Sequence, residues 1–199
     1  MSGFLIAPFR LVKGENQWTE YRDMLPALQD AAMARAQDIW KGFKFGGVLP
    51  ASKEYGITQF RPKDVLGGGT ATWTQTFGSA GSWCRIFSYN VPEDMVHAIA
   101  GFAIPDPTLI FSQLRFQIED RLYPIIDIEE AHTFGQGGFS LLIKQDKGKE
   151  LIVAEELAVL VRGFQERGTR NRTQRVIPLG FMLYKNKDLV IREVETSGT

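Results

Sequence analysis

Five arginines lie within fourteen residues of one another, and their chemistry is that of anion binding. They are Arg162, Arg167, Arg170, Arg172 and Arg175. Only one acid, Glu166, lies among them. Guanidinium groups bind phosphates and carboxylates through paired hydrogen bonds, and contacts with a polyanion release counterions. Two interpretations stay open: a loop that contacts nucleic acid or an acidic partner, and a solvated loop whose charges protect a strand edge.

A second group of polar residues has the types and spacing of a metal site. The group is Asp127, Glu129, Glu130 and His132. Glu129 and His132 would share one face of a helical turn, and two carboxylates with an imidazole can hold a divalent cation. The flanking sequence, however, indicates a strand and a glycine-rich loop, and the only other histidine is His97. The sequence leaves a metal site and a solvated turn both open, and we predict no cofactor.

The other candidates for chemistry lack their defining motifs. The chain has no Gly-x-Ser-x-Gly sequence, and Cys84 has no catalytic signature, so we interpret this cysteine as a small apolar strand residue. The run Gly67-Gly68-Gly69-Thr70 lacks the lysine of a phosphate loop and indicates a hinge or turn. The 23 acidic residues offer carboxylate pairs for glycoside hydrolysis, but none stands out by position. We therefore predict that the protein is not an enzyme.

Short strands must position these residues, because the chain from Ser82 to Val194 consists of β-rich segments separated by turn residues. Val, Ile, Phe, Tyr and Leu dominate the segments, and Gly, Pro, Asn or Asp bound them. The expected strands are Trp83–Val91, His97–Ile104, Thr108–Ile118, Tyr123–Ile128, Gly138–Lys144, Leu157–Gln165, Arg175–Tyr184 and Lys187–Val194. This pattern predicts a mainly β fold, a single jelly-roll-like antiparallel β-sandwich with an N-terminal arm and one helix.

The pattern within some segments predicts which strand faces are buried. Apolar and polar residues alternate in Gln113–Ile118, which predicts one dry and one wet face. Val176–Tyr184 is continuously apolar, so we expect the core to cover one face and the helix or a partner to cover the other. Pro178 lacks a backbone donor and predicts a sheet edge or a bulge. Glu150–Leu160 is ambiguous, with at most a turn or two of helix.

The sequence divides into residues 1–69, an arm, a helix and a connection, and residues 70–199, the β-sandwich domain. Phe4–Val12 is predicted to be an arm or an edge strand. As an arm it would contact neighbouring subunits through four apolar residues: Phe4, Leu5, Ile6 and Phe9. The helix is expected over Pro26–Lys41, with Pro26 in the first turn and Gly42 as C-terminal cap. Lys44–Thr72 reads as a loop-rich connection, and Thr70–Phe77 as a short strand that opens the sandwich.

Composition limits the function classes further. Lys plus Arg and Asp plus Glu number 23 each, so the 199-residue chain has a net charge of +0 and no overall attraction to polyanions or anionic membranes. A single cysteine cannot form an intrachain disulfide, which fits a reducing compartment or a particle assembled inside a cell. The N-terminal residues lack the basic region of a signal peptide, and no apolar run approaches the roughly 20 residues of a membrane helix.

Four segments together resemble virion structural proteins of the single jelly-roll type. They are Asn90–Asp94, Gly101–Pro105, Leu114–Ile118 and Val176–Phe181. The resemblance covers about residues 70–194 and implies a subunit whose arm and loops join neighbours in a symmetric shell. It further implies a homo-oligomer, possible contacts with a second structural protein or with nucleic acid, and a location in the virion after assembly in the host cell cytoplasm.

Other readings stay open. A capsid protein of the tailed-phage type would carry a longer helix than the one expected here. A cytoplasmic binding module would present aromatic residues such as Trp73, Trp83 and Phe87 to a sugar or peptide. A small cupin-like enzyme would need two or three histidines on neighbouring strands, and His97 and His132 are the only two in the chain.

Overall fold

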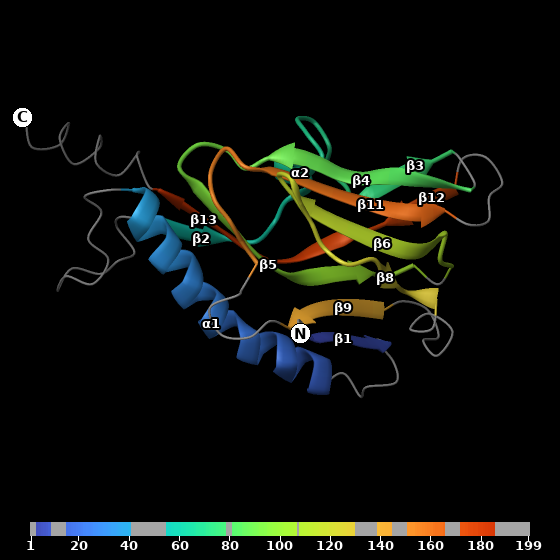
Figure 1. Cartoon of the computed structure of the whole chain (residues 1–199), viewed down its shortest axis with the longest axis horizontal. Coiled ribbons are helices and arrows are strands. Elements are labelled where there is room, and N and C mark those ends of the chain that lie inside the picture. The colour runs from blue at the N-terminus through green and yellow to red at the C-terminus, as the bar shows by residue number, and fades with distance from the viewer. Residues whose placement is uncertain are drawn as a thin grey trace, which may run out of the picture.

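The computed structural model describes residues 3–8, 15–40, 55–78, 81–106, 108–129, 139–144, 151–165 and 172–185. These residues form three layers: a long helix, a middle sheet beneath it, and an outer sheet on the far side of the middle sheet (Figure 1). All strand pairs are antiparallel. The expected mainly β sandwich with a helix is therefore confirmed.

Two sheets and one ribbon contain all the described strands. The middle sheet has the order β1 (Gly3–Pro8), β9 (Phe139–Lys144), β5 (Met95–Ile104), β13 (Ile177–Lys185) and β2 (Tyr55–Thr58), with β10 (Ile152–Val153) also paired to β5. The outer sheet has the order β4 (Ser82–Asn90), β11 (Ala158–Gln165), β6 (Phe111–Ile118) and β7 (Arg121–Leu122), with β8 (Ile126–Asp127) also paired to β6. The ribbon pairs β3 (Thr74–Phe77) with β12 (Arg172–Arg175).

Eight of the strands, four from each sheet, pair according to one rule. Taken along the chain, the eight are β2, β4, β5, β6, β7, β9, β11 and β13. The first pairs with the last, the second with the seventh, the third with the sixth, and the fourth with the fifth. The chain thus runs out and back as one long antiparallel ribbon, which is folded over into the two sheets.

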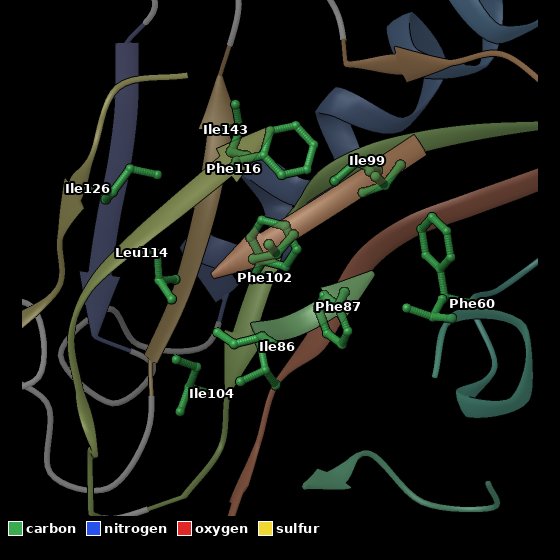
Figure 2. Close-up of a cluster of buried hydrophobic side chains, with 14 of the residues drawn as sticks. Phe60, Ile86, Phe87, Ile99, Phe102, Ile104, Leu114, Phe116, Ile126 and Ile143 are labelled. Atoms are coloured by element: carbon green, nitrogen blue, oxygen red, sulfur yellow. The ribbon is translucent and has the colours of Figure 1, made fainter. Parts of the chain in front are cut away.

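The core between the two sheets is apolar and rich in aromatic rings. Phe102 of β5 stacks on Phe87 of β4 with ring centroids 6.1 Å apart, and it contacts Phe116 of β6 at 6.0 Å. Figure 2 shows these rings with aliphatic side chains from both sheets, such as Ile99 and Leu114. Full burial of each such side chain stabilises the fold by about 1.5–3 kcal/mol, so packing in this core is the main interaction between the two sheets.

A second core lies on the opposite face of the middle sheet, under helix α1 (Glu15–Ile39). The helix buries Leu28, Ala32 and Ala36 against a set of small and branched residues on the sheet. Those sheet residues are Val96, Ala98, Ala100, Phe181 and Leu183. The apolar strand near Phe181 is therefore covered on both faces, as expected, and the chain's own helix supplies the second cover.

A bulge allows β5 to contribute to both cores. The pairing of β13 with β5 shifts between Leu179 and Gly180, which leaves Ala100 as an extra residue. Even-numbered residues before the shift face the helix, whereas Phe102 and Ile104 beyond it face the other sheet. Gly180 opposes the bulge with a φ of 135°, and a Cβ there would overlap the carbonyl oxygen of Ala98. Only glycine suits this position without strain.

The expected start of the helix was wrong. Helix α1 begins at Glu15, and Pro26 lies inside it instead of in its first turn. Proline removes one backbone hydrogen bond, but Tyr21, Met24 and Leu25 are half-buried against the sheet on its N-terminal side. This packing keeps the helix continuous through the proline. The expected cap Gly42 and the expected apolar residue Phe43 lie outside the described residues.

The connection expected over Lys44–Thr72 contains regular structure that the sequence did not indicate. Strand β2 extends the middle sheet, and the short helix α2 (Pro62–Val65) begins with its proline at the first helical position. Val65 and Phe60 beside it are buried in the core between the sheets. Residues 1–69 thus contribute β1, β2 and α1 to the same layers that residues 70–199 form.

Several strand boundaries differ from expectation. Thr108–Ile118 yields a strand only from Phe111, Tyr123–Ile128 yields only β8, and Thr70–Phe77 yields only β3. Pro178 lies where β13 is paired to β5 alone, because the described pairing with β2 covers only Met182 to Lys185, and the register shift that follows Leu179 fits the expected bulge. The strand expected over Lys187–Val194 lies outside the described residues.

Candidate functional site

The outer face of the outer sheet carries a line of three arginines. Arg162 of β11 pairs in register with Arg85 of β4 on one side and with Arg115 of β6 on the other. Because neighbouring strands lie about 4.8 Å apart, the three backbone positions span roughly 10 Å across the sheet. We call these three residues the arginine row. The strands that carry it lie side by side in Figure 1.

Strand alternation and a bulge place the row on the outer face. On β11, Val159 and Val161 point into the core, so Arg162 points outward. On β4 the register shifts opposite Val161 and Arg162, and both Ile86 and Phe87 are buried. This extra inward residue leaves Arg85 on the outer face, directly opposite Arg162.

No carboxylate neutralises the row within the part of the chain that the structure describes. The ion pairs of the described residues, within 4.0 Å, involve other basic side chains. Arg85 and Arg162 are exposed, and Arg115 is half-buried. Like charges directly opposite one another on a sheet are destabilising, so folding alone gives no reason for this arrangement. In a chain with a net charge of +0, the row is a local concentration of positive charge.

An aromatic pair lies beside the arginine row. Trp83 of β4 pairs with Phe164 of β11, and their ring centroids are 5.5 Å apart. The guanidinium carbon of Arg115 lies 4.7 Å from the centroid of the Trp83 ring. This cation–π contact holds the Arg115 head group in place. Both rings are half-buried and belong to neither apolar core, so the face combines fixed positive charge with accessible aromatic surface.

Of the five arginines predicted as a contact loop, the structure describes three, and these lie on two different strands. Arg162 belongs to the arginine row, Arg172 and Arg175 are exposed on β12, and Arg167 and Arg170 lie outside the described residues. The Nε atom of Arg175 lies 3.0 Å from Oδ1 of Asp106, and its backbone N–H donates to Oδ2 of the same carboxylate. Arg175 therefore has a structural partner in its own chain.

Gln174, the residue before Arg175, joins the same segment as the contact between Arg175 and Asp106. The buried Gln174 side chain accepts a hydrogen bond from the backbone N–H of Ile110 at 2.9 Å and donates to the carbonyl of Thr108 at 2.9 Å. Together with Asp106, it ties β12 to the segment that leads into β6. This part of the predicted contact loop holds the fold together.

The residues predicted as an assembly arm form a strand within their own chain. Phe4, Leu5 and Ile6 belong to β1, which pairs with β9 and forms one edge of the middle sheet. Phe9 lies outside the described residues. The prediction allowed for an arm or an edge strand, and the described part of the segment is an edge strand.

The predicted metal group is only partly described. The carboxylate of Asp127, on β8, accepts a hydrogen bond of 3.0 Å from the backbone N–H of Glu129, which is a local turn contact. Glu130 and His132 lie outside the described residues. Among the residues that are described, no three ligating side chains come together as a metal site.

His97 is buried between the two sheets. Its Nδ1 atom lies 3.2 Å from the hydroxyl of Tyr89, and the Phe60 ring meets the imidazole edge-on at 5.2 Å. Burial lowers the pKa of His97 to about 4, with nearby Asp64 opposing the shift, and burial also raises the pKa of Tyr89. The imidazole is therefore neutral at pH 7 and acts as a packed core residue.

The aromatic residues named for a sugar- or peptide-binding module do not share one surface. Phe87 is buried in the core, which contradicts its predicted role in presenting a ring to a ligand. Trp73 packs edge-on against Phe87 at 6.2 Å. Of the three, only Trp83 lies on the outer face. Cys84, its neighbour, points inward toward Gln165, as expected for a small apolar strand residue.

Comparisons with known proteins give no relative: no family model, no curated protein and no solved structure matches this chain. The described helices include none that is both long and apolar enough to cross a membrane. The candidate site therefore depends on its own geometry.

Sequence reasoning missed Arg85, Arg115 and Phe164 as members of this site, and it named Trp83 only as a ring for a sugar or peptide. Alternation did place Arg115 on a wet strand face, but nothing local linked it to residues far away in the chain. The signal that joins them is the strand order β4-β11-β6 together with the register, and both are properties of the folded sheet.

Proposed function

We propose that this protein is a structural subunit of a symmetric assembly, a capsid-type virion protein of the single jelly-roll kind. The pairing of first strand with last, second with seventh, third with sixth and fourth with fifth supports a jelly roll, the double-sheet fold of many viral capsid proteins and lectins. Because a fold does not determine a function, the proposal needs support from the surface as well.

The observation that carries the proposal is the position of the exposed apolar side chains. Among the described residues, the large hydrophobic side chains that are exposed are Ile57, Leu122 and Ile125, at 45%, 59% and 46%. Ile57 lies on β2, at one edge of the middle sheet, and the other two lie at the β7–β8 edge of the outer sheet. Open strand edges with apolar side chains favour contact with another chain.

Tyr123 anchors the β7–β8 edge to β6. Tyr123, between the two exposed residues, donates its backbone N–H to the carbonyl of Phe116 at 3.0 Å and packs its ring on that residue at 5.1 Å. The guanidinium of Arg121 covers the Tyr123 ring at 5.0 Å. This anchor ties the segment that carries Leu122 and Ile125 to β6, so a neighbouring copy would meet two exposed apolar side chains on a paired edge.

The proposal implies contacts with copies of the same chain and leaves room for a second structural protein. A stable interface needs about 1,000 Å² or more, so the apolar residues would form its centre and the strand edges the remainder. A net charge of +0 offers little repulsion between copies. In this proposal the protein has no enzymatic activity and resides in the virion after assembly in the host cytoplasm.

Sedimentation velocity at micromolar concentration tests the proposal with a double variant, Leu122→Ser with Ile125→Ser. We expect the native chain to sediment as species larger than its 22.4 kDa monomer. The variant should have a dissociation constant at least about tenfold higher, which corresponds to a loss of about 1.4 kcal/mol in the free energy of association. Thr74→Ser with Thr76→Ser, at exposed positions of β3, is the control. A native chain that stays at 22.4 kDa would overturn the proposal.

A further inference from the structure

We infer that the arginine row, with Trp83 and Phe164, binds single-stranded nucleic acid. The guanidinium groups would contact successive phosphates, and bases would stack on the aromatic pair. The inference goes beyond the proposed assembly and does not depend on it, because every residue involved lies on one outer sheet of a single chain.

Charge indicates that the ligand is an anion. The three arginines are in register on adjacent strands, and no described carboxylate lies within 4.0 Å of their guanidinium groups. An anion placed over the row would relieve the repulsion among them. Arginine binds phosphate with planar, paired hydrogen bonds, and the row consists of arginine alone.

The shape of the row indicates a linear polymer. It runs across three strands for roughly 10 Å, and each of its members comes from a different strand. The head group of Arg115 lies over Trp83 of β4, so its side chain reaches across β11. A chain of phosphates can meet all three guanidinium groups at once.

The aromatic pair distinguishes nucleic acid from other polyanions. A positively charged surface combined with aromatic side chains is the pattern of proteins that bind single strands, where each stacked base contributes about 1–3 kcal/mol. Trp83 and Phe164 lie on the outer face and pack into neither core, so the fold does not require their rings there. An acidic peptide or a sulfated glycan would use the arginines but would have no bases to stack.

Binding exchanges one contact for another at Arg115. In the free protein its guanidinium covers one face of the Trp83 ring. When a phosphate takes the guanidinium, that ring face becomes available to a base. Phosphate contacts carry no sequence information, and a stacked base of any type suits the ring, so we expect binding without sequence preference.

Fluorescence anisotropy with labelled oligodeoxythymidine across a salt series tests the inference. For three phosphate contacts we expect a slope of log affinity against log salt near −2, since each contact contributes about 0.7 for single strands. The variant Arg85→Ser, Arg115→Ser, Arg162→Ser should lose at least about tenfold in affinity and most of this slope. Trp83→Leu should lose about tenfold while it keeps the slope, because it removes about 1–3 kcal/mol of stacking and no phosphate contact.

A second triple variant controls for net charge. Arg22→Ser, Arg35→Ser, Lys63→Ser removes the same charge from exposed positions on α1 and α2. It should bind oligodeoxythymidine as the native chain does. Equal losses in both triple variants would mean that only net charge matters and would overturn the inference. Thermal unfolding of each variant verifies that the fold is intact.

Competitors separate the ligand classes, and a further variant separates this inference from the assembly proposal. Polyglutamate or heparin that displaces the oligonucleotide at equal charge concentration, together with no loss in Trp83→Leu, would assign the row to an acidic or sulfated partner instead. The Leu122→Ser, Ile125→Ser variant should still bind oligodeoxythymidine as a monomer. Failure of assembly alone would therefore leave this inference standing, and failure of binding alone would leave assembly standing.

Discussion

The two outward faces of the sandwich differ in whether the chain itself covers them. On the middle sheet, Val96, Ala98 and Ala100 are fully buried because α1 lies over them. On the outer sheet, the equivalent face carries the arginine row and an aromatic pair, and its arginines are exposed or half-buried. Each sheet of a sandwich has one face turned away from the shared core. In this chain α1 covers that face of the middle sheet, whereas that face of the outer sheet is charged. This difference is the basis of our proposal that a partner from outside the chain binds the outer sheet.

A charge placed on each face in turn gives the largest expected difference. Ala98→Arg puts a charge on the helix-covered face, where an unpaired charge should cost at least about 4 kcal/mol of the free energy of unfolding or expel α1. Ser88→Arg makes a matched change at an exposed position of β4 and should cost within about 0.5 kcal/mol. Urea denaturation measures both, and similar losses would mean that the faces do not differ as described.

Acid should destabilise the folded protein through His97, which is buried between the two sheets. Its pKa is about 4 in the folded protein and 6.5 when unfolded, so below pH 6.5 the unfolded chain takes up a proton that the folded chain refuses until about pH 4. The contribution of His97 to the free energy of unfolding is therefore fully present above pH 6.5. It decreases by about 3 kcal/mol in total as the pH falls to 4. His97→Leu should remove this part of the pH dependence of unfolding, and an unchanged difference between pH 7 and pH 4 would contradict the assignment.

Gln174 should matter for stability and leave binding unaffected. Gln174→Ala leaves the backbone N–H of Ile110 and the carbonyl of Thr108 without their partner, which should cost about 1–3 kcal/mol in chemical denaturation. Its affinity for oligodeoxythymidine should not change, because Gln174 lies on β12 and outside the outer sheet. A variant that kept its stability but lost binding would place part of the site on β12.

The smallest effect is expected for the arginines that the sequence singled out. Arg167→Ser, Arg170→Ser, Arg172→Ser should change the free energy of unfolding within about 0.5 kcal/mol, as the interpretation of a solvated loop predicts. If these residues also bind a polyanion, removing each arginine–phosphate pair should reduce the salt slope by about 0.7–0.9. We expect a smaller decrease in affinity than for the arginine row, and a larger decrease would move the site to the loop.

The sequence predicted what depends on local pattern. β-rich segments bounded by turn residues located β4, β5, β11 and β13 within a few residues, and alternation predicted the dry face of β6 correctly. These features follow from neighbouring residues along one strand. The helix start was wrong because Pro26 is typical of a first turn, and the packing of Tyr21 and Leu25 on the sheet decided otherwise.

The sequence could not predict what depends on pairing between distant strands. The bulges at Ile86 and Ala100 arise from register, and each decides which residues face the core. The arginine row joins positions 85, 115 and 162, which become neighbours only through the order β4-β11-β6. A cluster of arginines in sequence was visible from the start, whereas a cluster in space required the sheet.

We propose that this chain forms a closed, symmetric assembly, and native mass spectrometry of the purified protein is the most direct test. We expect masses at multiples of 22.4 kDa that end at one copy number, because closed symmetry fixes the number of subunits. The Leu122→Ser, Ile125→Ser variant should shift this distribution toward the monomer. A spectrum with only the 22.4 kDa species, or a continuous ladder with no preferred copy number, would contradict the claim.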